Sequence, residues 1–158
     1  FAIGFDALTG ALNAIDIVGK DGVKLKEKWA DGPITYLGLA VNGFPNLFTI
    51  TGPGSPSVLS NMMTSIEQHV DWVTDCIEHM INFGNVEIEA ARDAEINWTD
   101  HVDETASKTV GYGCNSWYVG ANVPGKKVVY MPYIGGVGTY REKCDEIALS
   151  GYKGFHLS

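Results

Sequence analysis

A short segment rich in glycine and proline, Gly52-Pro53-Gly54-Ser55-Pro56, constrains the fold of this chain more than any other feature. It excludes a regular helix or a central strand, because proline lacks an amide hydrogen and glycine is conformationally free. The apolar run Leu47 to Thr51 precedes it and predicts a buried strand that ends at this loop. With the helical pattern that follows, residues 47–81 are predicted to form a strand-loop-helix unit, which in open α/β folds borders a ligand site.

The helix after this loop is predicted from apolar residues that recur at helical spacing. Its predicted buried face consists of Met62, Ile66, Val70, Val73, Ile77, Met80 and Ile81. The segment Thr64-x-x-Glu67 has the spacing of a capping box, although Ser60 or Asn61 could cap an earlier turn. Gly84 is placed to end the helix in the left-handed conformation.

The remaining elements are shorter or more weakly patterned. Predicted strands cover residues 1–4, 128–134 and 154–157, and a hairpin joins residues 15–18 to 23–25. Predicted helices cover residues 24–29, as one turn, then 87–107, as a peripheral helix, and 139–150. Residues 111–127 are predicted to form a long loop, and long loops of this kind are usually functional.

Charge and cysteine content exclude several classes of function. The chain has 19 acidic and 11 basic residues, and a formal net charge of -8 repels phosphate backbones and anionic lipids. We therefore expect neither a nucleic-acid partner nor a membrane partner. Three cysteines without Cys-x-x-Cys spacing indicate neither a disulfide framework nor a zinc site, and favour a reducing, cytoplasmic location. The four histidines lack the spacing of a metal site.

The start of the chain resembles the interior of a domain. A length of 158 residues favours one domain over two. The chain begins with the apolar run Phe1-Ala2-Ile3-Gly4, which has no initiator Met and reads as a buried strand that ends at a glycine. We therefore expect residues 1–158 to be the C-terminal portion of a longer protein.

Three residue patterns could carry chemistry. Cys114 has neighbours like those of a cysteine-protease nucleophile, with His101 or His156 as a candidate base, but a structural cysteine is the preferred interpretation. Trp117 lies in the long loop, and its indole could hold a nicotinamide or a ribose, although a core-filling tryptophan is equally common. His69 is interpreted as a helix-edge histidine that is satisfied by hydrogen bonds.

Longer strings of residues closely resemble the C-terminal part of the Baeyer–Villiger monooxygenases, in particular the phenylacetone and steroid types. They occur in order along essentially the whole chain and are highly specific when taken together. They comprise residues 1–10 (FAIGFDALTG), 25–29 (LKEKW), 35–38 (TYLG), 43–48 (GFPNLF), 52–56 (GPGSP), 60–62 (SNM), 65–70 (SIEQHV), 116–126 (SWYVGANVPGK) and 151–155 (GYKGF).

This resemblance implies an α/β fold, as the C-terminal part of a flavoprotein with two Rossmann-type domains, for FAD and NADP, and a helical segment. Residues 1–158 would complete the FAD-binding domain and form a wall of the substrate pocket. A protein of this family uses NADPH and O2 to convert ketones to esters or lactones through a C4a-peroxyflavin. The catalytic residues would lie in the upstream part of the enzyme, so this portion alone is expected to be inactive.

The resemblance also assigns site residues. Gly4 matches the strand end that joins the two cofactor domains, where the threonine of the family is replaced by Ile3. Met62 matches a position that contacts the flavin ring, and Trp117 matches the tryptophan that holds NADP. The substrate-pocket positions are Ser57, Val58, Leu59, Met131 and Pro132.

The loop at residues 52–65 resembles the longer form that occurs in aryl-ketone and steroid-type members. We therefore expect an aryl-alkyl or bulky ketone as the substrate. Two alternatives remain open. One is a flavin-containing or N-hydroxylating monooxygenase, and the other is a non-catalytic binding module that reuses the tail of a flavoprotein.

Overall fold

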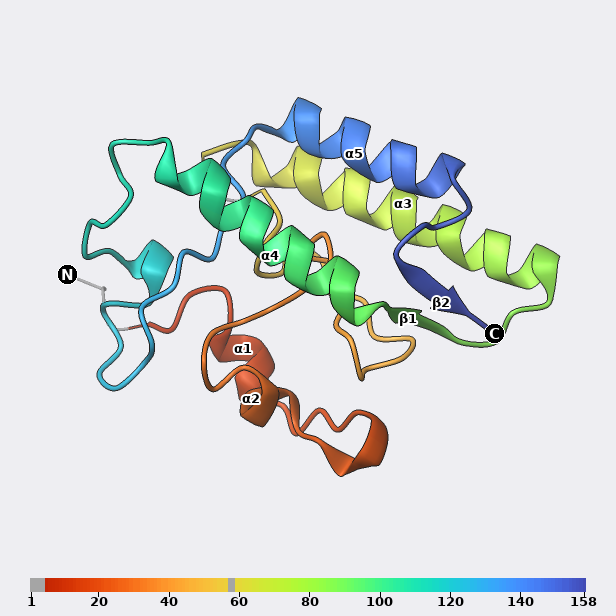
Figure 1. Ribbon diagram of the computed structural model, residues 1–158, viewed down its shortest axis with the longest axis horizontal. Helices are drawn as coiled ribbons and strands as arrows, with labels where there is room; N and C mark the ends of the chain where they lie inside the picture. Colours follow the sequence, from red (N-terminus) through yellow and green to blue (C-terminus); the bar gives the residue numbers. More distant parts are fainter. Residues whose placement is uncertain (1–4, 57–58) are drawn as a thin grey trace.

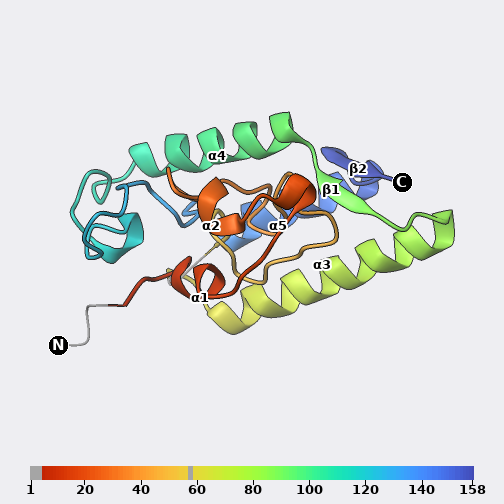
Figure 2. The same ribbon diagram turned by 90° about the horizontal axis from the view of Figure 1, so that it is seen from below.

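The computed structural model describes residues 5–56 and 59–158, in which long helices enclose a central coil. Figure 1 shows α3 and α5 side by side, with α4 running at an angle to them, and Figure 2 shows the coil of residues 30–56 between α4 and α3. The elements in chain order are α1 (Gly10–Asn13), η1 (Lys20–Gly22), α2 (Leu25–Lys28), α3 (Met62–Phe83), β1 (Ile88–Ala90), α4 (Arg92–Ser107), η2 (Trp117–Val119), α5 (Val137–Leu149) and β2 (Phe155–Leu157).

Strands are scarce in the described residues. β1 and β2 pair in an antiparallel ribbon, with Ile88 opposite Leu157, so the strand predicted at residues 154–157 is confirmed. The strands predicted at residues 47–51 and 128–134 are wrong, because each segment makes a single bridge, from Phe48 to Ala40 and from Tyr133 to Pro56. A strand needs a neighbour along its length, and hydrophobicity alone does not supply one. The chain thus mixes helix and strand, and the strand predicted at residues 1–4 lies outside the described residues.

The predicted hairpin and one-turn helix near the start of the chain are present in reduced form. Val18 and Lys24 form one antiparallel bridge, and the residues between them include the short helix η1. The hydrogen bond from Leu25 N to Ile17 O, at 3.0 Å, extends the pairing. α2 then covers Leu25–Lys28, as predicted for residues 24–29.

The predicted helix is present as α3, and its N-terminal cap is Asn61. The side chain of Asn61 accepts a hydrogen bond from Met63 N at 3.0 Å, and Thr64 lies inside the helix. One of the two earlier capping positions is therefore correct, and the capping box at Thr64 is wrong. Gly84 ends the helix with φ = 73°, as predicted.

The buried face of α3 is rotated away from the apolar stripe. Its buried residues are Ser65, Gln68, His69, Trp72, Cys76 and Met80. Val70, Ile77 and Ile81 of the predicted face are exposed. Two aromatic contacts determine this rotation, because Trp72 packs against Tyr152 and Phe155 with ring centroids 5.2 and 5.8 Å apart.

α4 begins later than predicted and is not peripheral. Residues 88–90 form β1, so the helix starts at Arg92, while its predicted apolar side at Trp98, Val102 and Ala106 is buried. Trp98 stacks on Tyr133 with ring centroids 5.4 Å apart. It therefore belongs to the main core, which contains residues of α3, α4, α5 and the coil at residues 36–40. α5 begins at Val137, two residues before the predicted start.

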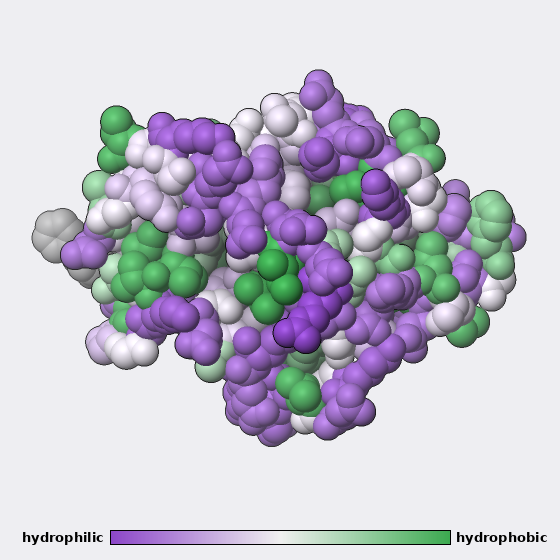
Figure 3. Space-filling model, viewed as in Figure 1, coloured by the Kyte–Doolittle hydropathy of each residue, from purple (hydrophilic) through white to green (hydrophobic). Residues whose placement is uncertain are grey.

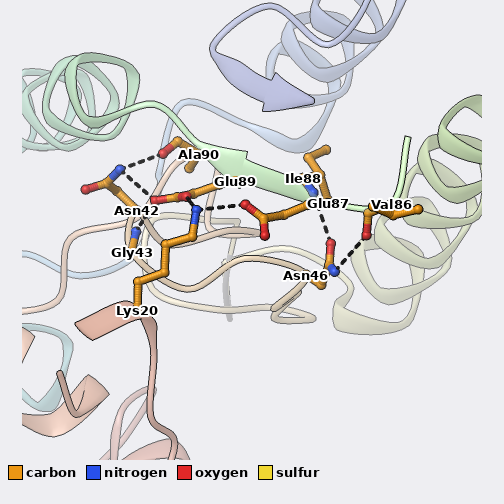
Figure 4. A network of polar contacts seen from close by, with 9 residues as sticks. All are labelled: Lys20, Asn42, Gly43, Asn46, Val86, Glu87, Ile88, Glu89 and Ala90. Atoms are coloured by element: carbon orange, nitrogen blue, oxygen red, sulfur yellow. Dashed lines mark hydrogen bonds and ion pairs between the residues drawn. The ribbon is translucent and has the colours of Figure 1, made fainter. Parts of the chain in front are cut away.

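A network of polar contacts connects the first third of the chain to β1 and the residues beside it (Figure 4). Lys20 Nζ donates to Glu87 at 2.7 Å and to Glu89 at 2.5 Å. Glu89 also accepts hydrogen bonds from Gly43 N, at 2.7 Å, and from Asn42 Nδ2, at 3.3 Å. The hydrogen bonds from Lys20 and Gly43 outweigh the effect of partial burial and lower the pKa of Glu89.

The surface agrees with the acidic composition. Figure 3 shows hydrophilic residues over most of one face, with separate hydrophobic patches between them. Among the described residues, no helix combines the length and the hydrophobicity that a transmembrane span requires.

Candidate functional site

An open groove with a volume of about 750 Å³ lies beside the start of α3. Four parts of the chain form it, namely the segment from Phe5 to Leu12, the coil from Phe48 to Gly52, Met62 and Trp117. Its lining is mainly apolar, and Asp6, Thr49 and Thr51 are its polar members. Such a groove can take a planar, largely apolar group.

The groove brings together two of the three residues that were assigned to cofactor binding. Met62 is the first residue of α3 and is half-buried. Trp117 belongs to η2, and its ring stacks on Tyr118 with centroids 4.0 Å apart and lies 6.1 Å from the ring of Phe5. Gly4, the third, lies outside the described residues. Residues far apart in the sequence thus present a thioether and an indole to one groove.

The loop that carries Trp117 is attached to the N-terminal segment. Lys126 Nζ forms an ion pair with Asp6 and donates to Thr9 Oγ1 at 2.6 Å. Asn122 Nδ2 donates to Phe5 O at 2.8 Å. These contacts hold Phe5 beside Trp117. Sequence reasoning did not find the role of Asp6 and Thr9, because their partner lies more than a hundred residues away along the chain.

The residues assigned to the substrate pocket are placed differently. Ser57 and Val58 lie outside the described residues. Leu59 is 74% exposed, whereas Met131 and Pro132 are buried. Met131 O accepts a hydrogen bond from Gly54 N at 2.7 Å, behind the loop. Neither Met131 nor Pro132 lines the groove described above.

The Gly52–Pro56 loop is a buried packing loop. Besides the bond from Gly54 N, Ser55 N donates to Gly52 O at 3.1 Å, and Trp98 Nε1 donates to Gly54 O at 2.9 Å. Because these amides already have protein partners, the loop resembles an ordinary crossover more than an anion-binding cradle.

His69 is fully buried, at 0% exposed, and is not at the edge of α3. Its Nδ1 accepts a hydrogen bond from Thr51 N at 3.0 Å. Burial lowers the pKa of His69 to about 4, so the imidazole is neutral at pH 7. The prediction of a histidine satisfied by hydrogen bonds holds for Nδ1, while Nε2 has no partner among the described residues.

Cys114 is exposed, and its sulfur lies 4.0 Å from Val110 O. His101 packs instead against Trp98 and Tyr133, with ring centroids 5.4 and 5.8 Å apart. In the described part of the chain, no hydrogen bond joins this thiol to a histidine, which agrees with the preferred interpretation of a structural cysteine.

Comparison with known proteins gives a consistent set of relatives, although no protein-family model matches the chain. The acetone monooxygenase (methyl acetate-forming) of Gordonia sp. (strain TY-5) is 46% identical over 158 residues, which cover 99% of this chain and 30% of that protein. A Baeyer–Villiger monooxygenase of Pseudooceanicola batsensis is 38% identical over 96% of this chain and 28% of its own length. A phenazine N-monooxygenase of Lysobacter antibioticus is also 38% identical, over 99% of this chain and 29% of its own length.

Solved structures agree with these sequence relatives. An oxidised steroid monooxygenase bound to NADP matches with a TM-score of 0.89 and 48% identity, over 97% of this chain and 28% of that chain. The complex of OTEMO with FAD and NADP matches with a TM-score of 0.90 and 38% identity, over 98% of this chain and 28% of that chain. The chain thus spans less than a third of the length of these relatives. By sequence and by structure, it is a homologue of one segment of the Baeyer–Villiger monooxygenases.

Proposed function

We propose that this chain is part of a flavoprotein monooxygenase that uses FAD, NADPH and O2 to convert ketones to esters or lactones. The observation that carries the proposal is the groove at which Met62 and Trp117 meet, in a chain that matches such enzymes over its whole length. In this proposal, residues 1–158 complete a Rossmann-type FAD-binding domain and supply one wall of the active site. The upstream part of the enzyme supplies the catalytic residues.

The residues of the groove fit the proposed cofactors. Met62 would contact the flavin ring through its polarisable thioether, and Trp117 would hold NADP through the face and the N–H of its indole. The apolar side chains of Phe5, Phe48 and Ile50 would exclude water from the ring edge. A bound flavin supplies the activation of O2 with electrons from NADPH, and the protein positions the reactants.

The substrate class rests on the loop at residues 52–65, whose length suggests an aryl-alkyl or bulky ketone. Ser57, Val58, Leu59, Met131 and Pro132 are the proposed pocket positions. The named relatives include a steroid monooxygenase and an acetone monooxygenase, at 48% and 46% identity, so similarity alone favours neither a large nor a small ketone. The proposal for a bulky ketone therefore depends on the loop.

The experiment uses the complete protein encoded by the gene that carries this sequence. We expect a purified protein with the absorption spectrum of bound flavin, whose NADPH oxidation rises when an aryl-alkyl ketone is added. The 158-residue chain alone is the control and should not oxidise NADPH. A complete protein that is colourless after reconstitution with FAD would contradict the proposal.

A second candidate function is N-oxidation, because a phenazine N-monooxygenase is 38% identical over 99% of this chain. The same protein can be supplied with a ketone and, separately, with an aromatic amine or N-heterocycle. Ester formation from the ketone supports the first proposal. An N-oxide as the sole oxygenated product supports the second.

A further inference from the structure

The hydrogen bond between His69 and Thr51 connects the interior of α3 to one wall of the groove. His69 is fully buried, and its ring meets the edge of Tyr140 with centroids 5.4 Å apart. Its Nδ1 receives the amide hydrogen of Thr51 at 3.0 Å. Thr51 lines the groove, together with its neighbours Ile50 and Gly52. His69 itself does not line the groove, so it acts on the groove only through the backbone of this turn.

The backbone conformation of the turn at Thr51 needs stabilising contacts from outside the turn. Thr51 has φ = 54°, a left-handed conformation that is unfavourable for a β-branched residue. Its neighbour Gly52 is tightly enclosed, because an added Cβ would lie 2.4 Å from Thr49 Oγ1 and 2.6 Å from Gly38 O. Strained backbone of this kind persists when surrounding contacts determine it. The bond to His69 is one such contact.

Met62, which lines the groove, and His69, which binds the turn, belong to the same helix. Met62 begins α3 and lines the groove, and His69 lies about two turns further along the same helix. A helix is stiff over this length. The bond to Thr51 therefore fixes the distance between the turn and Met62, which both line the groove.

The chemistry of His69 also favours a role beyond core filling. Because Nδ1 accepts a hydrogen bond, the proton of the neutral ring is on Nε2, which has no partner among the described residues. A buried donor without a partner is costly, and leucine would fill this space without that cost. The bond to Thr51 is what histidine provides and leucine does not.

We propose that His69 is a positioning residue that holds the turn at residues 50–52 against Met62, so that the groove keeps the shape required by the flavin. This inference rests on the proposed function, because it names the flavin as the group that uses the groove. The bond to Thr51 itself does not depend on the identity of the ligand. The two parts can therefore be tested separately.

The test compares two variants of the complete protein. His69→Asn keeps an acceptor oxygen close to the position of Nδ1, whereas His69→Leu removes the acceptor and retains the apolar volume. Amide hydrogen exchange at Thr51 and the dissociation constant for FAD are measured for both. We expect His69→Leu to raise exchange at Thr51 and weaken FAD binding, each by roughly tenfold, as for the loss of one hydrogen bond. His69→Asn should remain close to the unaltered protein in both measurements.

A double variant distinguishes the loss of the bond to Thr51 from a general loss of structure. Glycine adopts φ near 54° without strain, so Thr51→Gly in the His69→Leu background should recover part of the FAD affinity. If His69→Leu does not fold, His69→Gln replaces it, because the longer side chain carries its amide past the Nδ1 position.

Three outcomes decide between the inferences. A folded His69→Leu protein with unchanged exchange at Thr51 and unchanged FAD affinity would overturn the positioning role. Faster exchange at Thr51 with unchanged FAD affinity would also overturn it, since the turn would then be irrelevant to the flavin. If the unaltered protein does not bind FAD, the proposed function fails and the flavin role of His69 fails with it, while the exchange data still report on the bond to Thr51.

Discussion

Gly54 shows at the residue scale why the Gly-Pro-Gly-Ser-Pro segment needs its second glycine. Its φ is 87°, and an added Cβ would lie 2.7 Å from Thr35 Oγ1 and 3.2 Å from Trp98 Nε1. Gly125 has a similar φ of 78° but open space around it. Gly54→Ala should therefore destabilise the chain by about 2–4 kcal/mol, whereas Gly125→Ala should cost only about 1 kcal/mol.

Urea denaturation of the 158-residue chain measures both glycine variants. The difference between them isolates the effect of close packing from that of backbone conformation. Equal losses of stability in the two variants would contradict the tight packing of the loop.

Leu59 provides a residue-scale test of the proposed substrate pocket. Its side chain is 74% exposed, so Leu59→Ala should change the stability of the chain by less than about 0.5 kcal/mol. In the complete protein, the variant should broaden the substrate range, because a shorter side chain leaves more room for bulky ketones. The measurement is kcat/KM for a series of ketones of increasing size. An unchanged profile would argue against the assignment of Leu59 to the pocket.

His69 also makes the stability of the fold depend on pH. Its pKa is lowered from 6.5 to about 4 by burial, so the unfolded chain binds a proton at a higher pH than the folded chain does. The contribution of the neutral ring is fully present above pH 6.5 and is lost as the pH falls toward 4. Between pH 7 and pH 5 this loss should be about 2 kcal/mol.

The control for this pH dependence is His69→Asn, which has no group that titrates at this position. Urea denaturation at pH 7 and pH 5 should give a smaller fall in the free energy of unfolding for the variant. The other titratable groups are common to both proteins. The same fall in both would show that the charge state of His69 does not affect folding.

At the element scale, the patterns predicted which helices form better than they predicted how the helices pack. The periodicity and Gly84 defined the end of α3, whereas its start was left open between Thr64 and an earlier cap at Ser60 or Asn61. The predicted buried face was only partly correct, because Trp72 counted little in a stripe of aliphatic residues, yet it packs against Phe155 of β2 and against Tyr152. Periodicity shows that a helix has an apolar side, but tertiary partners decide which side is covered.

The rotation of α3 gives a direct prediction. Trp72 is buried, and its Nε1 donates to Cys144 O at 2.9 Å, so Trp72→Ala should destabilise the chain by about 3–5 kcal/mol. Ile81 belongs to the stripe predicted from sequence but is 71% exposed, so Ile81→Ala should cost less than about 0.5 kcal/mol. Thermal and urea denaturation of the two variants measure these losses of stability. A larger loss for Ile81→Ala than for Trp72→Ala would contradict the observed packing.

Strand prediction failed for a related reason. Residues 88–90 resembled the start of a helix, but they pair with residues 155–157, which lie far away in the sequence. Residues 47–51 and 128–134 had the hydrophobicity of strands without partners on both sides. Local composition records the preference of a segment, whereas pairing depends on the whole chain.

At the scale of the whole molecule, the site was predicted mainly from resemblance and not from periodicity. Met62 was an ordinary apolar residue of a helical stripe, and only the matching of longer strings singled it out, whereas Trp117 was already a candidate from its place in the long loop. The structure places both at one groove, with Phe5 beside them. Asp6, Thr9 and Thr51 could not be found in this way, because their contacts join segments distant in sequence.

We propose that this chain belongs to an enzyme that inserts one oxygen atom from O2 into a ketone. The most direct measurement supplies the complete protein with NADPH, an aryl-alkyl ketone and ¹⁸O2, and analyses the product by mass spectrometry. We expect an ester that carries one ¹⁸O atom. Oxidation of NADPH that yields hydrogen peroxide and unchanged ketone, with no labelled ester from any ketone tested, would contradict it.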